Sequence, residues 1–573
     1  MAAELVIKNG HIITVDSDNS IREAVAVSEG RIVAVGANEE MTPYIGPATR
    51  ILDLHGHTML PGINDTHMHG PYFGATRPPL ALDLTAPAVT SIEEMVDALK
   101  AKVAETPAGE WIRGFGWDVG TLKECKNDPS RMPRRSDIDA VSPDNPVVFN
   151  DFSGHTLLVN SKALEIAGIT AQTPAPPSGE IERDPATGEP TGLFKEPAAI
   201  AMVSTHIPLL TREEKRQAVL TAVHELNKNG ITSFTDAAIG PGGETMLFGV
   251  MSGEFVEIYR ELLLEGKLTV RTNVLLLMGD YGALTLDDIK KNFDTFAIPD
   301  DTDPLRLQFS GVKMFADGVP LTGTSWMKEP YEAGGYGASV VPGATEEDKR
   351  DNLKEMVNYV HSKGFMAGIH ATGDRAVDAA AEAFMYACDN NPDVSVRHQL
   401  IHGDFMDPET TRALSKYPCG VSMQPAIGAM ISDFEPAVVG AERAAKEFPA
   451  RMVQQSGLVL TFSCDAPVTL PNWRQGVQAA VLRENVVSGR VSGPEECITR
   501  EEAIRAYTLN GAWQDNMEKE KGSIEVGKLA DFCILGEDIL TVEARRIGEI
   551  PVLATVYNGE IVFDGSKGLF EEK

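Results

Sequence analysis

The sequence predicts an α/β protein whose middle part forms a (β/α)₈ TIM barrel and whose two ends form one small β-domain. Three observations support this prediction. Helical and buried-strand patterns alternate through the middle of the 573-residue chain, and short alternating strands with tight turns occupy both ends. A stretch far longer than a simple βα loop follows the first buried strand, which indicates a large insertion.

The two ends of the chain share one pattern, in which short apolar runs are broken by turn residues. The first end contains LVIKNGHIITVD and AVAVSEGRIVAVG, and the far end contains GSIEVGKLADFCIL and ATVYNGEIVFDG. Such runs with Asn-Gly and Glu-Gly turns are typical of β-hairpins. We therefore expect residues 1–57 and 515–573 to pair into one composite domain.

The middle part repeats a helix followed directly by a buried strand. The helix TEEDKRDNLKEMVNYVHSKG begins at Thr345, whose hydroxyl can cap it, and stops at Gly364, where FMAGIHA follows. The helix TREEKRQAVLTAVHELNKNG, with a capping box of Thr211 and Glu214, precedes ITSFTDA in the same way. This order is typical of parallel βαβ units.

Eight buried strands can be counted in residues 58–514, and eight is the number that closes a TIM barrel. The predicted strands are 58–64, 231–236, 270–277, 311–315, 366–370, 398–402, 420–424 and 458–465. Residues 71–210 then form one insertion after the first strand, and we expect it to act as a lid or pocket wall. Barrel enzymes place their chemistry at the C-terminal ends of the strands.

Composition and charge exclude several classes of function. The formal net charge is −32 with no basic patch, so we expect neither nucleic acid nor a membrane surface as a partner. No apolar stretch reaches the ~18 residues of a membrane span, and the first residues do not resemble a secretory signal, so we expect a cytoplasmic enzyme. The six cysteines are scattered singly, and we interpret them as buried thiols.

The strongest local motif is LPGINDTHMHG at the end of the first barrel strand. His67 and His69 are two residues apart, so on a strand they point to the same face and can chelate one ion. Three later strands also finish on ligand-type residues: His370 ends FMAGIH, His402 ends RHQLIH and Asp465 ends LVLTFSCD. One such histidine is more often a satisfied core residue, but their convergence at one face of the barrel favours a metal centre. The other histidines outside this pattern are interpreted as structural, namely His11, His206, His224, His361 and His398.

Lys313, in the run FSGVKMFADG, is predicted to point into the barrel mouth from the fourth strand. A buried ammonium is costly and would repel a metal ion, so the charge must be neutralised. The neutral amine can react with CO₂ to give a carbamate, whose two oxygens can bridge two cations. The alternative is a lysine in a salt bridge, with Asp317 as its partner.

This order of residues resembles the amidohydrolase superfamily, and in particular its YtcJ-like branch, the amidohydrolase-3 family that includes N-substituted formamide deformylases. The resemblance extends over nearly the whole chain. Its motifs are LPGINDTHMHG, WIRGFGWD, SGHTLLVNSKAL, VKMFADG, IHATGDRAVD, LIHGDFMD, SCDAPV and GSIEVGKLADFCIL. One departure is Cys464, which stands where such sequences carry a small serine before the aspartate.

The resemblance implies a composite β-sandwich from the two ends and a metal site around Zn²⁺, as a pair of ions, with another divalent metal as the alternative. The implied metal-site residues are His67, His69, Lys313 with its carbamate from CO₂, His370, His402 and Asp465. We hypothesise that the two metals share a bridging hydroxide that attacks the carbonyl of a small amide, such as an N-substituted amide, a formamide or a cyclic amide. Asp465 is expected to be the catalytic residue that takes the proton and delivers it to the departing nitrogen.

The insertion contributes three candidate substrate-binding residues, Trp117 and Asp118 in GFGWD and His155 in SGHT. In one interpretation they line the pocket and orient the substrate. In the other, Trp117 belongs to a core and Asp118 to a turn.

Two other functions stay open. One is hydrolytic deamination of a ring, although ATGD after His370 lacks the glutamate usual there in such sites. The other is a non-catalytic regulatory protein with the same fold, although none of the ligands is missing. By analogy with other barrels, a homodimer is the favoured assembly.

Overall fold

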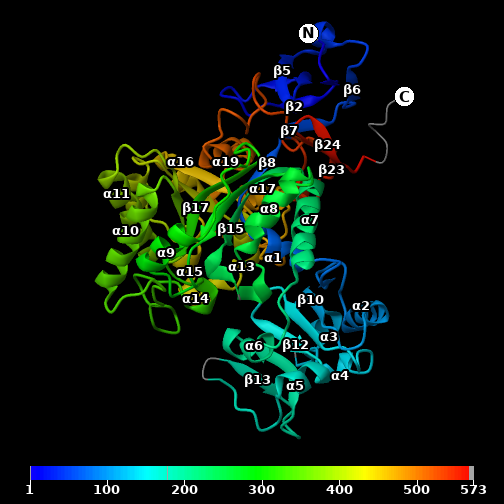
Figure 1. The fold of residues 1–573 in the computed structure, drawn as a ribbon, viewed down its shortest axis with the longest axis vertical. Helices are drawn as coiled ribbons and strands as arrows, with labels where there is room; N and C mark the ends of the chain where they lie inside the picture. The colour runs from blue at the N-terminus through cyan, green and yellow to red at the C-terminus, as the bar shows by residue number, and fades with distance from the viewer. Residues whose placement is uncertain (1, 129, 177–178, 245, 567–573) are drawn as a thin grey trace. The chain divides into compact units, whose positions relative to one another are not determined.

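The computed structural model describes residues 2–128, 130–176, 179–244 and 246–566. The chain divides into two compact units (Figure 1). The larger unit comprises Met1–His69, Val223–Glu244 and Met251–Lys573, and the smaller comprises Gly70–Ala222 and Thr245–Val250.

An eight-stranded parallel sheet forms the centre of the larger unit, and its strand order follows the chain from β8 to β21. The strands are β8 (Ile63–Met68), β15 (Ile231–Ile239), β16 (Arg271–Leu277), β17 (Leu307–Phe315), β18 (Met366–Ala371), β19 (His398–His402), β20 (Cys419–Met423) and β21 (Val459–Phe462). They are buried along most of their length, as expected for parallel strands covered on both faces. This sheet confirms the predicted barrel.

Helices connect these strands and cover the outside of the barrel (Figure 1). They include α8 (Glu254–Leu264), α9 (Leu286–Thr295), α10 (Glu346–Ser362) and α11 (Asp374–Asn390). Helix α10 begins as the sequence predicts, because the Thr345 hydroxyl accepts a hydrogen bond from Asp348 N at 3.1 Å. Within the described ranges, none of the helices combines the length and the apolar character that crossing a bilayer requires.

The first and last barrel strands meet at their C-terminal ends. The backbone amide of Asp465 donates to the carbonyl of His67 at 2.9 Å, and that of His69 donates to the carbonyl of Ala466 at 2.9 Å. Deeper in the barrel, the hydroxyl oxygens of Thr66 and Thr461 lie 2.9 Å apart. These contacts bring the end of β21 beside the end of β8.

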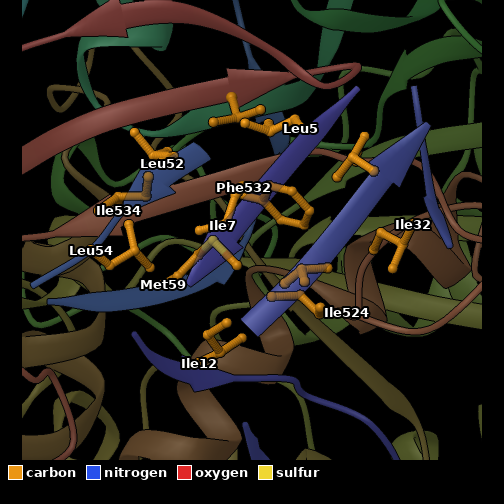
Figure 2. Close-up of a cluster of buried hydrophobic side chains, with 14 of the residues drawn as sticks. Leu5, Ile7, Ile12, Ile32, Leu52, Leu54, Met59, Ile524, Phe532 and Ile534 are labelled. Atoms are coloured by element: carbon orange, nitrogen blue, oxygen red, sulfur yellow. The ribbon is translucent and has the colours of Figure 1, made fainter. Parts of the chain in front are cut away.

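Two further sheets of the larger unit combine the two ends of the chain. One has the order β5-β4-β1-β6 and the other β24-β23-β22-β7-β2-β3. Their strands are β1 (Leu5–Lys8), β2 (His11–Ile13), β3 (Ile21–Arg22), β4 (Ala24–Ser28), β5 (Arg31–Gly36), β6 (Arg50–Asp53), β7 (Thr58–Pro61), β22 (Phe532–Leu535), β23 (Val552–Tyr557) and β24 (Glu560–Asp564). Apolar side chains of both sheets, among them Ile7, Met59 and Phe532, form one buried cluster (Figure 2).

The predicted first barrel strand, residues 58–64, is corrected by the structure. Residues Thr58–Pro61 form β7, which pairs antiparallel with β22 in the sandwich, and the barrel strand β8 starts only at Ile63. Gly62 lies between them, and glycine is needed there because a Cβ would lie 2.0 Å from the Thr232 hydroxyl oxygen. The last strand also stops early: β21 ends at Phe462, and Asp465 lies in the loop beyond it.

The smaller unit is built on a six-stranded mixed sheet with the order β13-β14-β12-β11-β10-β9. Its strands are β9 (Leu82–Asp83), β10 (Ile112–Trp117), β11 (Val147–Asp151), β12 (Thr156–Val159), β13 (Glu180–Arg183) and β14 (Pro190–Lys195). The helix α2 (Ile92–Glu105) contributes to one buried cluster, and α5 (Ser161–Ala167) and α6 (Pro197–Ser204) contribute to another. The predicted insertion therefore has hydrophobic cores of its own.

A buried ion pair ties the barrel to the C-terminal segment. Arg271, the first residue of β16, donates from Nε and Nη2 to the Asp531 carboxylate at 2.6 and 2.8 Å. The same carboxylate accepts a hydrogen bond from Asn558 N at 2.8 Å. Both side chains are almost fully buried, so removing one partner would leave the other charge uncompensated.

We predict that Asp531→Ala lowers the free energy of unfolding by about 3–5 kcal/mol, because the buried Arg271 guanidinium loses its charge partner. Urea unfolding followed by circular dichroism measures this loss. The control is Glu520→Ala, which removes the partner of Arg31 in a half-exposed pair and should cost no more than about 1 kcal/mol. Equal losses for the two variants would contradict the prediction.

Candidate metal centre

His67 and His69 present their imidazoles to the same point at the end of β8. Nε2 of His67 lies 3.3 Å from Oδ1 of Asp465, and Nε2 of His69 lies 3.4 Å from the same oxygen. Two donors bound at 2.0–2.2 Å to a tetrahedral ion are separated by about 3.3–3.5 Å. Both distances to the Asp465 oxygen therefore match those between ligands of one metal ion, and ligand atoms of the three residues lie within 4.8 Å of one another.

Asp465 reaches this point through an unusual backbone conformation. Its φ of 53° is in the left-handed region, which costs free energy for a residue with a side chain. Among the residues that the structure describes, its buried Oδ1 has no hydrogen-bond partner of good geometry. Burial alone would raise the pKa of this carboxyl. The neighbouring imidazoles of His67, His69 and His402 together lower it by more than burial raises it, so the net pKa is well below the usual range. Asp465 is thus an ionised carboxylate with a free oxygen.

His402, at the end of β19, is held by one side chain that fixes its tautomer. Nε2 of Gln424 donates to the Ser422 carbonyl at 3.0 Å, so Oε1 is the atom that faces His402 Nδ1 at 2.7 Å. Nδ1 must therefore carry the proton, which leaves the lone pair on Nε2. The ring lies 5.5 Å from that of His67, centroid to centroid. His402 is available as a neutral ligand.

His370, on β18, is oriented in a similar way by the backbone. Its Nε2 lies 2.9 Å from the carbonyl oxygen of Gly318, which can only accept, so the lone pair is on Nδ1. Burial first, and then the charge of Lys313, lower the pKa of His370 to about 4. The rings of His370 and His402 lie 4.5 Å apart. Both rings are neutral at pH 7 and close enough to share a site.

Lys313, on β17, is 1% exposed, and its Nζ lies 4.9 Å from the centroid of the Phe315 ring. Among the residues that the structure describes, no carboxylate lies within 4.0 Å of this nitrogen, so it has no salt-bridge partner. The proposed partner Asp317 instead accepts hydrogen bonds from backbone amides, including those of Trp326 and Gly373, both at 2.9 Å. Burial lowers the pKa of Lys313 to about 7, although the charge of Asp465 acts in the opposite direction.

Two residues at this site were not found by the sequence analysis. Gln424 orients His402, and the fully buried Asp65 accepts hydrogen bonds from the amides of Cys464 at 3.0 Å and His67 at 3.3 Å. Burial raises the pKa of Asp65 to about 7, and the Cys464 thiol is hydrogen-bonded to it. Asp65 could have been noticed, because it stands two residues before His67 and therefore shares a face of the strand with it.

The three predicted substrate-binding residues lie in the smaller unit. The indole of Trp117 is 1% exposed within a hydrophobic cluster, and its Nε1 donates to the Phe149 carbonyl at 3.0 Å. Oδ1 of Asp118 accepts from Gly120 N at 2.8 Å within a turn. His155 is partly exposed, and its Nδ1 lies 3.0 Å from the Glu196 carboxylate. These contacts favour the core interpretation for Trp117 and the turn interpretation for Asp118.

Known proteins match this chain along nearly its whole length. The profile of a family described as "Amidohydrolase family" matches residues 50–563. YtcJ of Bacillus subtilis is 28% identical over 97% of this chain and 99% of its own length. N-substituted formamide deformylase of Arthrobacter pascens is 27% identical over 98% of each chain. Among solved structures, an uncharacterized metal-dependent hydrolase from Pyrococcus furiosus has a TM-score of 0.70 and 25% identity, over 94% of this chain and 100% of that one.

We predict that Gln424→Leu weakens metal binding about 10–100-fold, because His402 loses the acceptor that fixes its tautomer and ring orientation. Metal content after dialysis against graded chelator concentrations measures the effect. Gln308→Leu on β17 is the control, since the only side-chain hydrogen bond of Gln308 among the described residues goes to the Asp515 carbonyl, and metal affinity should be unchanged. Unaltered affinity in the Gln424 variant would show that the amide does not support the ligand.

We predict that Trp117→Ala destabilises the protein by about 3–5 kcal/mol, because it leaves a cavity and an unpaired Phe149 carbonyl. Thermal and urea unfolding measure the loss of stability. The control is Trp111→Ala, which removes a partly buried indole from the other cluster of this unit and should lower the stability less. A changed KM with unchanged stability would instead support the substrate-binding interpretation.

Proposed function

Because the chain belongs to the amidohydrolase family, we propose that it is a metal-dependent hydrolase that cleaves a C–N bond of a small amide. The observation that carries the proposal is the convergence of His67 Nε2, His69 Nε2 and Asp465 Oδ1 with 3.3–3.4 Å spacing. The Arthrobacter relative named as an N-substituted formamide deformylase favours an N-substituted amide or formamide as the substrate, with a cyclic amide as the next candidate.

The chain's own groups fit a divalent cation. His67, His69 and Asp465 would hold one ion, and His370 and His402 would hold a second through the lone pairs that their hydrogen bonds leave free. Imidazole and carboxylate donors of this kind suit Zn²⁺ best. When bound, such ions supply a hydroxide nucleophile at neutral pH and polarise a carbonyl oxygen.

Lys313 completes this set as a carbamate. Its amine is buried and has no anionic partner within the described residues, so a positive charge there would be uncompensated. In the reaction, the neutral nitrogen attacks the carbon of CO₂ and loses one proton, which gives an anionic group with two oxygens. This change replaces a charge that repels cations with one that attracts them.

Asp465 is the residue that moves protons. Its carboxylate is ionised, so it can take a proton from the attacking water. The same carboxylate can then donate that proton to the nitrogen that leaves the amide. The left-handed backbone at Asp465 keeps the carboxylate at the mouth of the barrel, where both transfers take place.

We predict that Asp465→Asn lowers kcat at least about 10²-fold, because the amide side chain cannot accept the proton. The assay screens N-formyl, N-acyl and cyclic amides with zinc-reconstituted enzyme, and then compares variants on the best substrate. Metal content should be retained. Asp433→Asn, on the surface beside Arg490, is the control and should keep full activity.

Near-normal kcat in the Asp465 variant would refute its role. Release of ammonia from amino-substituted rings, without cleavage of any amide, would favour a deaminase. Folded wild-type protein that binds no metal would favour a non-catalytic protein.

A further inference from the structure

The smaller unit contains a cavity that the sequence analysis did not identify. Its volume is about 390 Å³, which is large enough for a small molecule. The lining residues that the structure describes all belong to the smaller unit, and Trp117, Asp118 and His155 are not among them. Six apolar residues form most of the wall, namely Ala75, Ala81, Phe115, Leu210, Leu247 and Val250.

One face of the mixed sheet forms the floor of this cavity. Arg113 and Phe115 are two residues apart on β10, so they share a face of the sheet. Phe115 is the register partner of Asn150 on β11, which places Asn150 beside it. Helix α1 (Gly70–Ala75) lies over this face, since the rings of Tyr72 and Phe115 are 6.4 Å apart, centroid to centroid. The sheet and α1 therefore bound the cavity on two sides.

Three polar side chains that line the cavity have unused hydrogen-bonding groups. Among the described residues, neither the Tyr72 hydroxyl nor the Asn150 side-chain amide has a hydrogen-bond partner. Nη2 of Arg113 donates to the Pro208 carbonyl at 3.0 Å, but its buried Nε has no partner in the described part of the chain. A mostly apolar cavity with a few free polar groups is the usual form of a small-molecule site.

The charge of Arg113 is only partly balanced by the protein. Within the described residues, Glu214 is the one carboxylate within 4.0 Å, and its Oε1 lies 3.7 Å from Nη1, which is too far for a hydrogen bond. Oε2 of Glu214 instead accepts from the amide and the hydroxyl of Thr211 at 2.7 and 2.8 Å. Because a guanidinium stays charged at neutral pH and has only donors, the group that completes this site must be an acceptor, and an anion suits it best.

We propose that this cavity is a binding site for a small carboxylic acid with an apolar body. The guanidinium of Arg113 would donate to the carboxylate, whose two oxygens match its planar fork. The hydroxyl of Tyr72 and the amide of Asn150 would donate to the same group. Phe115 and Leu247, which is 39% exposed on the cavity wall, would pack against the apolar body.

This site goes beyond the proposed function, because its lining contains none of the candidate metal ligands and its chemistry requires no metal ion. Binding is therefore measured with full-length protein from which metal has been removed by a chelator and dialysis. This treatment also prevents a metal ion from binding the carboxylate itself. Dithiothreitol is present because Cys388 and Cys497 are partly exposed, so the expectation that all six cysteines are buried is wrong for these two.

Isothermal titration calorimetry compares acids with their uncharged analogues. The compounds are benzoate, phenylacetate and hexanoate, each beside the carboxamide of the same shape. At least one acid should bind to a single site, and its carboxamide should bind at least about tenfold more weakly, because it lacks the charge that faces Arg113. Equal affinities for acid and amide, or binding of none of the three acids, would overturn the proposal.

Two variants locate the binding site. Arg113→Met keeps a long side chain without the charge and should weaken binding of the best acid at least about tenfold. Ala75→Leu leaves Arg113 in place but fills the cavity, so it should weaken binding of the acid and of its carboxamide alike. The matched control is Lys162→Met, which removes one positive charge from an exposed pair with Glu165 in the same unit and should bind as the wild type does.

Circular dichroism and the unfolding midpoint establish that each variant is folded. Unchanged affinity in Arg113→Met, or an equal loss in Lys162→Met, would contradict a carboxylate site in this cavity. If Arg113→Met does not fold, Ala75→Leu decides the location, and unchanged acid binding in that variant would refute it. Since the protein carries no metal in these titrations, their outcome does not depend on whether it hydrolyses amides.

Discussion

The candidate metal centre depends on the way the last barrel strand is joined to the first. Two backbone hydrogen bonds, from Asp465 to His67 and from His69 to Ala466, align the end of β21 with the end of β8. This alignment places Oδ1 of Asp465 against both imidazoles. The closed barrel therefore does more than bury apolar residues, because its closure assembles one ligand set from residues almost 400 positions apart.

The groups around this set fix the tautomers of two of the ligands. Gln424 and the Gly318 carbonyl take the N–H groups of His402 and His370, and burial keeps both rings neutral. Asp465 stays ionised in the same interior, and the buried Lys313 amine has no carboxylate within 4.0 Å among the described residues. Neutral imidazoles and an ionised carboxylate are the protonation states that a cation site requires before the cation binds.

Much of this could be predicted from the sequence, since the barrel order and the ligand residues follow from strand periodicity and from the positions of strand ends. The need for glycine at position 62 could not, because it follows from the close approach of Thr232, a residue more than 150 positions away. The position of Asp465 beyond β21 depends on a left-handed φ that the sequence FSCDAP does not indicate. The sequence around Trp117 is compatible with a core residue and with a pocket residue. Its packing in the buried cluster that includes α2 favours the core.

The composite β-sandwich has a consequence for how the chain is made. Strand β7 pairs with β22, which lies more than 450 residues later, and the cluster around Phe532 contains side chains from both ends of the chain. During synthesis the early strands leave the ribosome long before their partners exist, and an unpaired apolar edge is prone to aggregation. Most of the barrel is therefore translated before this sheet can be completed. The exposed strand edge of the nascent chain is the kind of surface that chaperones protect from aggregation.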